Sequence, residues 1–137
     1  MRAMGALVTC VLLAPVPALA ADHLVRDPAA YAAAVKKAAP GDRILLADGE
    51  WRDFQIVFMG QGTAAKPITL AAQTPGKVIL SGQSNLRIGG AHLVVSGLVF
   101  RNGFSPTREL IAFRRDSKTL ANNVRLTEIV VDNFTNP

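Results

Sequence analysis

Hydrophobic and polar positions repeat at a fixed spacing in the second half of this chain. Residues 93–103, LVVSGLVFRNG, are followed 31 residues later by residues 124–134, VRLTEIVVDNF, with the same order of apolar and polar positions. Each copy holds two short β-prone runs separated by a small or polar break, and an asparagine follows the second run. Repetition of this kind indicates stacked structural units rather than one closed globule. Such stacks have long flat faces that suit polymeric ligands.

Other short apolar runs precede and separate the two copies. The predicted strands are residues 43–47, 51–59, 68–70, 78–80, 86–88, 93–95, 98–100, 110–113, 124–126 and 129–131, with turns at 48–49, 60–62, 74–76 and 89–90. Short strands that end at Gly, Asn or Asp are typical of an all-β fold, the parallel β-helix. A β-sandwich or small barrel is the alternative. It is disfavoured because the breaks Ser96-Gly97 and Thr127-Glu128 are not hairpin dipeptides.

A helix is predicted over residues 29–39, before the first strands. Asp27 is placed to cap the free amides of the first turn, and Pro28 suits the first helical position. Lys36 and Lys37 lie in the last turns, where positive charge is favourable to the helix dipole. Because a stack of β-coils exposes strand edges at its ends, we expect this helix to cap the N-terminal end of the stack.

The first 20 residues have the pattern of a secretory signal peptide. Arg2 supplies the positive start, residues 7–14 form an apolar core, and Ala18-Leu19-Ala20 is a small-residue cleavage site, so we expect cleavage after Ala20. A membrane anchor is the alternative, but the apolar run is too short to span a bilayer, and no later segment is apolar enough.

Cysteine usage agrees with export without disulfides. The single cysteine, Cys10, lies inside the predicted signal peptide, so the mature chain has none. A lipoprotein site at Cys10 is disfavoured because Thr9 is larger than the residue that usually precedes such a cysteine. We therefore expect a secreted or periplasmic bacterial protein.

These signals divide the chain into three parts. Residues 1–20 are the expected signal peptide, residues 21–43 an N-terminal segment with the capping helix, and residues 44–137 the first coils of a β-helix. The sequence stops three residues after the second repeat copy. We therefore expect a β-helix that is incomplete at its C-terminal end, as the amino-terminal part of a longer protein.

Charge narrows the choice of partner. The formal net charge is +5 at pH 7, and removal of Arg2 with the signal peptide lowers it to +4. A basic balance favours acidic polysaccharide, nucleic acid or an anionic membrane. Export makes acidic polysaccharide the expected partner, rather than nucleic acid. No feature of the sequence indicates an oligomeric state.

One segment is richer in cations than the rest of the chain. It contains Arg101, Arg108, Arg114, Arg115 and Lys118, opposed only by Glu109 and Asp116. We predict Arg114, Arg115 and Lys118 as substrate-binding residues, because arginine forms forked hydrogen bonds with a uronate or a sulfate. The alternative is solvated charge on a loop. Nearby, Asn122, Asn123 and Asn133 are expected to be corner residues whose amides stack between coils.

Residues that carry catalysis are not evident. His23 and His92 are far apart, and they are expected at the surface and in a turn respectively. Asp48 and Glu50 are close together, but acids at turns are mostly structural, and a glycosidase pair is not expected. The sequence has no phosphate-binding glycine loop before a helix and no G-x-S-x-G motif. No catalytic residue and no metal ligand is therefore predicted within this chain.

Several ordered segments resemble polysaccharide lyase family six, which holds alginate lyases and the chondroitinase B type of dermatan sulfate lyase. They are TPGKVILSG (residues 74–82), NLRIGGAHLVVSGLVFRNG (85–103), IAFRRDSKTLANNVRLTEIVVDNF (111–134) and the opening DPAAYAAAVKKAAPGDRILLADGEW (27–51). The resemblance implies a right-handed parallel β-helix that cleaves acidic glycans by β-elimination, with alginate favoured over dermatan sulfate. It also implies calcium, held by an Asn and a Glu-x-Glu pair, that neutralises the uronate carboxylate, with a lysine base and an assisting arginine.

None of these family residues can be placed on this sequence. The three glutamates, Glu50, Glu109 and Glu128, are isolated, so there is no Glu-x-Glu pair. We therefore expect the chain by itself to be inactive. One alternative function is a non-catalytic β-solenoid that binds acidic polysaccharide through Arg and Lys on one face. Another is a structural or adhesive solenoid. Pectate lyases and polygalacturonases share the architecture, but their strand motifs do not match this sequence.

Overall fold

The computed structural model describes residues 5, 9, 11–14 and 19–135. Most of the predicted signal peptide therefore lies outside the described residues. The elements of the described part are β1 (Asp22–Val25), α1 (Pro28–Lys37), β2 (Arg43–Leu46), β3 (Gly49–Arg52), β4 (Gln55–Gln61), β5 (Ile68–Ala72), β6 (Val78–Gln83), β7 (Asn85–Ser96), β8 (Leu98–Phe104), β9 (Ile111–Ala112), β10 (Ala121–Thr127) and β11 (Val130–Thr135). No helix in this part of the chain is long and apolar enough to cross a membrane.

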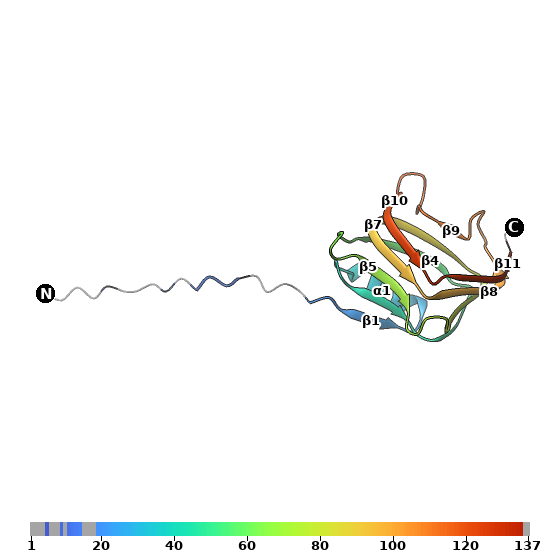
Figure 1. Cartoon of the computed structure of the whole chain (residues 1–137), viewed down its shortest axis with the longest axis horizontal. Helices are drawn as coiled ribbons and strands as arrows, with labels where there is room; N and C mark the ends of the chain where they lie inside the picture. The colour runs from blue at the N-terminus through green and yellow to red at the C-terminus, as the bar shows by residue number, and fades with distance from the viewer. Residues whose placement is uncertain (1–4, 6–8, 10, 15–18, 136–137) are drawn as a thin grey trace.

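The strands stack as successive coils of a parallel β-helix (Figure 1). One sheet has the order β1-β2-β5-β7-β10, and a second has the order β11-β8-β6-β3. A third face arises because the first half of β7 pairs with β4 and β9. The long strand β7 turns between two faces at His92, whose φ of 53° is left-handed. The solenoid makes about three turns, which confirms the predicted fold class.

The 31-residue repeat predicted from the sequence is one coil of the solenoid. Val124 of β10 lies beside Leu93 of β7, and Val130 of β11 lies beside Val99 of β8. Both pairings are parallel and join residues that are 31 apart in sequence. The two repeat copies are therefore neighbouring layers of the stack, as expected.

The core is a column of aliphatic side chains that runs through the stack. Ile44, Leu70, Val95 and Leu126 occupy the same register position in successive coils. The first three are fully buried, and Leu126 in the last coil is half-buried. Full burial of such a side chain stabilises the fold by roughly 1.5–3 kcal/mol, so each coil that is covered on both sides adds to the stability of the core.

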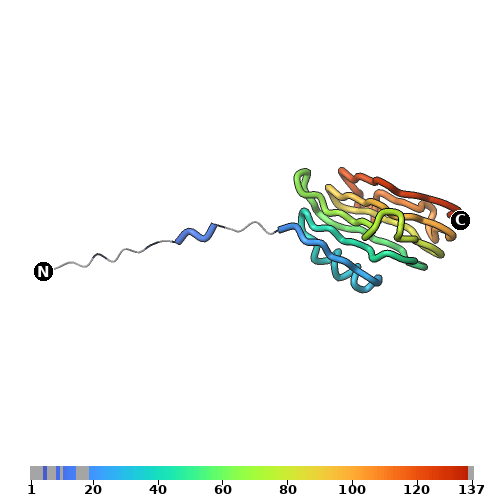
Figure 2. The backbone as a smooth tube through the Cα atoms, turned by 60° about the horizontal axis from the view of Figure 1, so that its bottom comes forward, coloured from blue at the N-terminus to red at the C-terminus, as the bar shows by residue number. Residues whose placement is uncertain are grey.

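The predicted helix is confirmed, and it covers the N-terminal end of the stack (Figure 2). The Asp27 side chain accepts a hydrogen bond from the Ala30 amide at 2.7 Å. Tyr31 is buried, and its hydroxyl donates to the Val57 carbonyl of β4 at 2.9 Å. Among the described residues, β4 pairs with β7 on one side and with no strand on the other. The helix therefore supplies a hydrogen-bond donor to a carbonyl on the unpaired side of β4.

Two predicted turns are in fact strand, and one predicted strand is divided. Gly60 and Gln61 lie within β4, and Gly89 and Gly90 lie within β7, where Gly60 pairs with Gly90. A Cβ on Gly90 would collide with the Gly60 carbonyl, so these glycines allow close approach of two coils. The predicted strand over residues 51–59 is divided between β3 and β4.

One corner of the coil is a column of left-handed residues. Asp53, Gly82, Asn102 and Asn133 have φ of 54°, 64°, 56° and 46°. The Asn133 side-chain amide donates to Asn102 Oδ1 at 2.9 Å, which confirms the predicted stacking for Asn133. For Asn123 the predicted corner is confirmed, but the residue opposite it in the preceding coil is His92, so it stacks on no amide there. Asn122 lies within β10 and pairs opposite Ala91, so the predicted corner is wrong for this residue.

Candidate functional site

The last part of the cationic segment lies in a loop, residues 113–120, between β9 and β10 (Figure 1); we call it the cationic loop. The Arg115 amide donates to the Thr119 carbonyl at 2.8 Å. Asp116 Oδ1 accepts the amides of Lys118 at 2.9 Å and Thr119 at 2.8 Å. The Lys118 amide foremost holds the pKa of the Asp116 carboxyl below its usual 3.8. Asp116 therefore stays ionised at neutral pH and closes the loop.

The cationic loop brings all three predicted binding residues together at the surface. Arg114 pairs with Glu109 at 3.1 Å, and Arg115 pairs with Asp116 at 3.0 Å. Lys118 forms no ion pair with any residue that the structure describes. Exposed ion pairs contribute little to stability, so an anionic ligand can displace them at small cost. The arrangement matches the solvated-loop alternative, and a substrate-binding role for these three residues stays a prediction.

The other cations of the segment lie outside this loop. Arg101 of β8 pairs with Asp132 of β11 at 2.9 Å, and so links two coils. Arg108 is exposed on the connection between β8 and β9. Lys118 also lines a shallow hollow of about 380 Å³ with Gln61, Gly90 and Asn122.

A second basic surface, absent from the sequence predictions, lies on the outer face of β2, β5, β7 and β10. Arg43, Thr69, Val94 and Arg125 stand side by side in register across these four strands. They line a hollow of about 330 Å³, here called the outer hollow, whose other walls include small side chains such as Ser96. Strands lie roughly 4.8 Å apart, so the Cα atoms of Arg43 and Arg125 are about 14 Å apart across the outer hollow.

The two arginines of the outer hollow differ in their partners. Arg43 pairs with Asp22 of β1 at 3.3 Å. Arg125 is exposed, and no acidic partner for it occurs within residues 19–135. A planar guanidinium at this position can bind a carboxylate through two parallel hydrogen bonds.

The acids of the first coils have structural roles, as the sequence indicated: Asp48 holds a turn, and Glu50 of β3 links that strand to β6. Asp48 accepts from the Thr74 amide at 2.9 Å and from its hydroxyl at 2.7 Å. Glu50 accepts from the Ser81 hydroxyl at 2.6 Å. Among the described residues there is no group of three or more His, Cys, Asp or Glu side chains that could hold a metal ion.

The two histidines occupy different settings. His92 lies at the predicted corner, with left-handed backbone. His23 is only half-buried, and its Nε2 lies 3.3 Å from Asp42 Oδ2. The prediction of a plain surface residue is therefore incomplete for His23, because Asp42 directly precedes β2, the strand that pairs with β1, and contacts His23 only after folding.

Comparison with known proteins places this solenoid in a family. The Chondroitinase B family model matches residues 25–137. The alginate lyase AlyGC, of polysaccharide lyase family six, is 59% identical with a TM-score of 0.83, over 85% of this chain and 16% of AlyGC. A mannuronic acid specific family six lyase from human gut microbiota is 28% identical with a TM-score of 0.72, over 81% of this chain and 26% of that protein.

The family six lyase Pedsa3628 from Pseudopedobacter saltans gives a TM-score of 0.62 at 41% identity, over 64% of this chain and 20% of its own length. Comparison with curated proteins gave no match. The chain thus spans 16% to 26% of the length of these three solved relatives. Fold, family model and sequence identity agree, and the chain belongs to polysaccharide lyase family six, the family of the alginate lyase AlyGC and of the matching Chondroitinase B model.

Proposed function

We propose that this chain provides coils of a secreted or periplasmic polysaccharide lyase that cleaves uronate-containing glycan, with alginate favoured over dermatan sulfate. The observation that carries the proposal is the 59% identity to the alginate lyase AlyGC over 85% of the chain. A second relative also supports alginate, because it is specific for mannuronic acid, which is one of the uronic acids of alginate. The predicted signal peptide supports export, where such polymers are found.

The proposed reaction is β-elimination. A base removes the proton next to the uronate carboxylate, the glycosidic C–O bond breaks, and the product carries an unsaturated uronate. Calcium would neutralise the carboxylate charge in this chemistry. The residues described here do not fit a calcium site, because no cluster of three or more metal-ligating side chains occurs among them. No step is therefore assigned to a metal or a catalytic residue in this chain.

These coils present exposed, positively charged side chains to which a polyanion can bind. Arg114, Arg115 and Lys118 are exposed on the cationic loop, and Arg125 is exposed in the outer hollow. Backbone pairing to both neighbouring strands holds Arg43 in the stack, and β10 pairs with β7 along most of its length. A uronate chain that lies across these coils would meet guanidinium groups whose backbone positions do not change on binding.

A chimaera tests the lyase proposal directly. Residues 21–137 would replace the matching segment of AlyGC, and unsaturated uronates released from alginate would be followed by ultraviolet absorbance. We expect the chimaera to form product, because the two segments share 59% identity and the same fold. The chain alone serves as a control and should form none. A folded chimaera that releases no product from alginate would contradict the proposal.

The second candidate function is non-catalytic binding of acidic polysaccharide. It is favoured by the exposed cations of the cationic loop and the outer hollow. Titration of the chain with alginate at low and at high salt would test it, because binding through exposed charges weakens as salt screens them. Failure to bind at low salt would exclude this candidate, whereas binding together with an inactive chimaera would favour it over the lyase.

A further inference from the structure

Ala21, the residue that follows the predicted cleavage site, forms two hydrogen bonds with the folded part of the chain. The Ala21 amide nitrogen lies 3.0 Å from Asp42 Oδ1, to which it donates. The Ala21 carbonyl accepts the Arg43 amide at 2.8 Å, and β1 starts at the next residue, Asp22. Ala21 is thus fixed by the folded chain on both sides of its backbone.

Asp42 is a buried carboxylate, with 7% of its surface exposed. Its second oxygen accepts the Ala39 amide at 3.0 Å and lies 3.3 Å from His23 Nε2. Two backbone amides and the imidazole of His23 are the groups that reach Asp42, and a buried carboxylate is favoured by a paired positive charge. The neighbouring cation Arg43 is paired with Asp22 instead.

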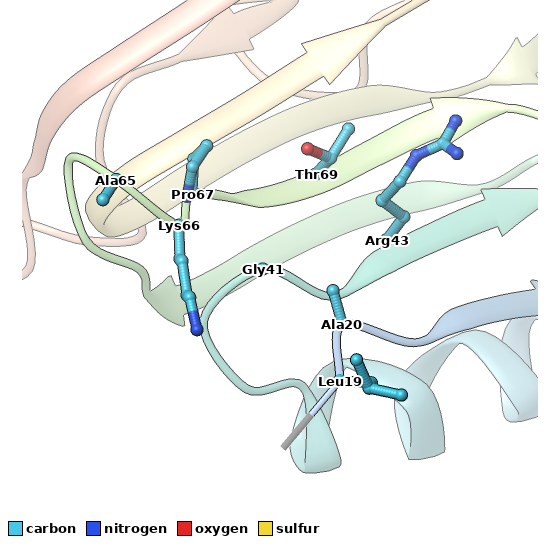
Figure 3. Close-up of a pocket in the computed structure, with 8 residues that line it drawn as sticks. All are labelled: Leu19, Ala20, Gly41, Arg43, Ala65, Lys66, Pro67 and Thr69. Atoms are coloured by element: carbon cyan, nitrogen blue, oxygen red, sulfur yellow. The ribbon is translucent and has the colours of Figure 1, made fainter. Parts of the chain in front are cut away.

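Leu19 and Ala20, the two residues before Ala21, lie at the surface of the molecule beside Gly41. Leu19 and Ala20 are exposed and form one wall of a hollow of about 490 Å³, whose other walls include Gly41, Lys66 and Pro67 (Figure 3). The bond between Ala20 and Ala21 therefore lies where the chain meets the folded body, with its N-terminal side exposed. Removal of Leu19 and Ala20 would take this wall away, while the pairing of β1 with β2 involves only residues from Asp22 onward.

We propose that cleavage between Ala20 and Ala21 creates an α-ammonium group that stays at the position of the Ala21 amide and forms a buried ion pair with Asp42. Water is consumed, the C–N bond breaks, the new carboxylate of Ala20 leaves with the signal peptide, and Ala21 keeps the nitrogen. Asp42 is then a receiving site for the mature N-terminus. The proposal depends on the predicted signal peptide and is independent of lyase activity.

The new charge changes how the fold responds to pH. An α-amino group has an ordinary pKa of about 7.7–8.0, and an adjacent buried carboxylate should raise it by about one unit or more. For a raised pKa, the stabilisation is complete below the unfolded value and is lost as the pH rises through the folded value. The groups that face Asp42 are His23 from β1, the Ala39 amide and the Ala21 nitrogen; Lys66 lies nearby, beside Gly41.

The test uses the protein as a bacterium exports it. The full chain would be expressed with its own signal peptide, the exported form sequenced from its N-terminus, and the α-amino group of Ala21 titrated by ¹⁵N NMR. We expect a start at Ala21 and a pKa about one unit or more above the ordinary range. The Asp42→Asn variant should return this pKa to the ordinary range.

A second variant keeps the proposal testable if the Asp42→Asn protein does not fold. Insertion of one glycine between Ala20 and Ala21 leaves Asp42 intact but moves the new amino group one residue away. We expect this protein to keep its fold, to titrate its amino group at the ordinary pKa, and to lose the stability change between pH 7 and pH 10. A mature chain that starts at another residue, or an Ala21 amino group with an ordinary pKa in the unaltered protein, would overturn the proposal.

Discussion

Tyr31 joins the helix to the edge of the stack through one buried hydrogen bond. Its hydroxyl donates to the Val57 carbonyl at 2.9 Å, and its ring meets Phe54 edge-on with centroids 5.3 Å apart. Burial raises the pKa of the Tyr31 phenol, so it remains a donor at all ordinary pH values. The residue therefore combines packing with satisfaction of one strand-edge acceptor.

Removal of only the hydroxyl separates these two roles. We expect Tyr31→Phe to lower the free energy of unfolding by about 1 kcal/mol, because the ring stays and one buried hydrogen bond is lost. Tyr31→Ala also removes the ring and should cost about 3–5 kcal/mol. Urea unfolding followed by fluorescence of Trp51, the one tryptophan, would measure both. Equal stability of Tyr31→Phe and the unaltered protein would mean that the Val57 carbonyl needs no donor.

Asp42 gives a prediction on the acid side of the pH range. The amides of Ala39 and then Ala21 hold its pKa below the usual 3.8. For a lowered carboxyl pKa, the stabilisation is present above the unfolded value and is lost as the pH falls through the folded value. We expect Asp42→Asn to be about 2 kcal/mol less stable at pH 7 and to show a flatter loss of stability below pH 4.

Chemical unfolding across pH 2–7 would measure this difference. Asp22→Asn is the matched control, because Asp22 forms an exposed pair with Arg43 and its loss should change stability by about 0.5 kcal/mol or less. If the two variants lose the same stability at every pH, the buried position of Asp42 has no special role.

At the level of elements, each coil turns at the same corners, and one corner shows what a repeat requires. Gly97 between β7 and β8 and Glu128 between β10 and β11 are 31 residues apart and have φ of 79° and 55°. A Cβ on Gly97 would lie 3.1 Å from Pro75 Cα, whereas Glu128 is exposed in the last coil. The inner corner therefore has less room than the outer one.

Substitutions at these two corners should change the stability of the fold in opposite directions. We expect Gly97→Ala to cost about 1–3 kcal/mol, since it adds both strain and a close contact. Glu128→Gly should be neutral or stabilise by up to about 1 kcal/mol, because glycine adopts a left-handed backbone without strain. Thermal unfolding of both variants would test this, and a stable Gly97→Ala protein would show that the corner can shift.

The elements differ in how far sequence alone could predict them. The last two coils have equal length, so the 31-residue repeat predicted the neighbours of Leu93 and Val99 correctly. Gly89 and Gly90 were predicted as a turn because glycine marks both turns and close backbone contacts. Only the neighbouring coil, which brings Gly60 against Gly90, distinguishes the two.

The candidate site shows the same limit. Arg114, Arg115 and Lys118 could be predicted as a group because they are adjacent in sequence. The outer hollow could not, since Arg43, Thr69, Val94 and Arg125 are separated by 26, 25 and 31 residues. These residues lie in register because the strands of successive coils pair in register. Their spacing in the sequence is irregular because the connections between the strands differ in length, so no sequence repeat marks them.

At the scale of the whole molecule, β10 connects the two basic surfaces. The cationic loop leads directly into β10 (Figure 1). Arg125 of the same strand lies in the outer hollow. The helix caps the opposite end of the stack (Figure 2). It carries the exposed cations Lys36 and Lys37. Positive charge is thus present at both ends of the stack, and we propose that a uronate chain binds at the end that carries β10.

This layout separates specific binding from net charge. We expect the triple variant Arg114→Gln, Arg115→Gln and Lys118→Gln to weaken binding of alginate about tenfold at low salt, as three exposed contacts of about 0.5 kcal/mol each are lost. Its binding should also depend less on salt, because fewer ionic contacts remain to be screened. Arg125→Gln should weaken binding less and add to the triple variant, since it lies on a separate surface.

The matched control removes the same charge at the other end of the molecule, through Arg26→Gln, Lys36→Gln and Lys37→Gln. These residues are exposed on or just before the capping helix. Isothermal titration with alginate oligomers at two salt concentrations would compare the two triple variants. Binding that falls in the loop variant alone locates the glycan beside β10. Equal losses in both would show that the chain attracts alginate through net charge, without a binding surface in the cationic loop.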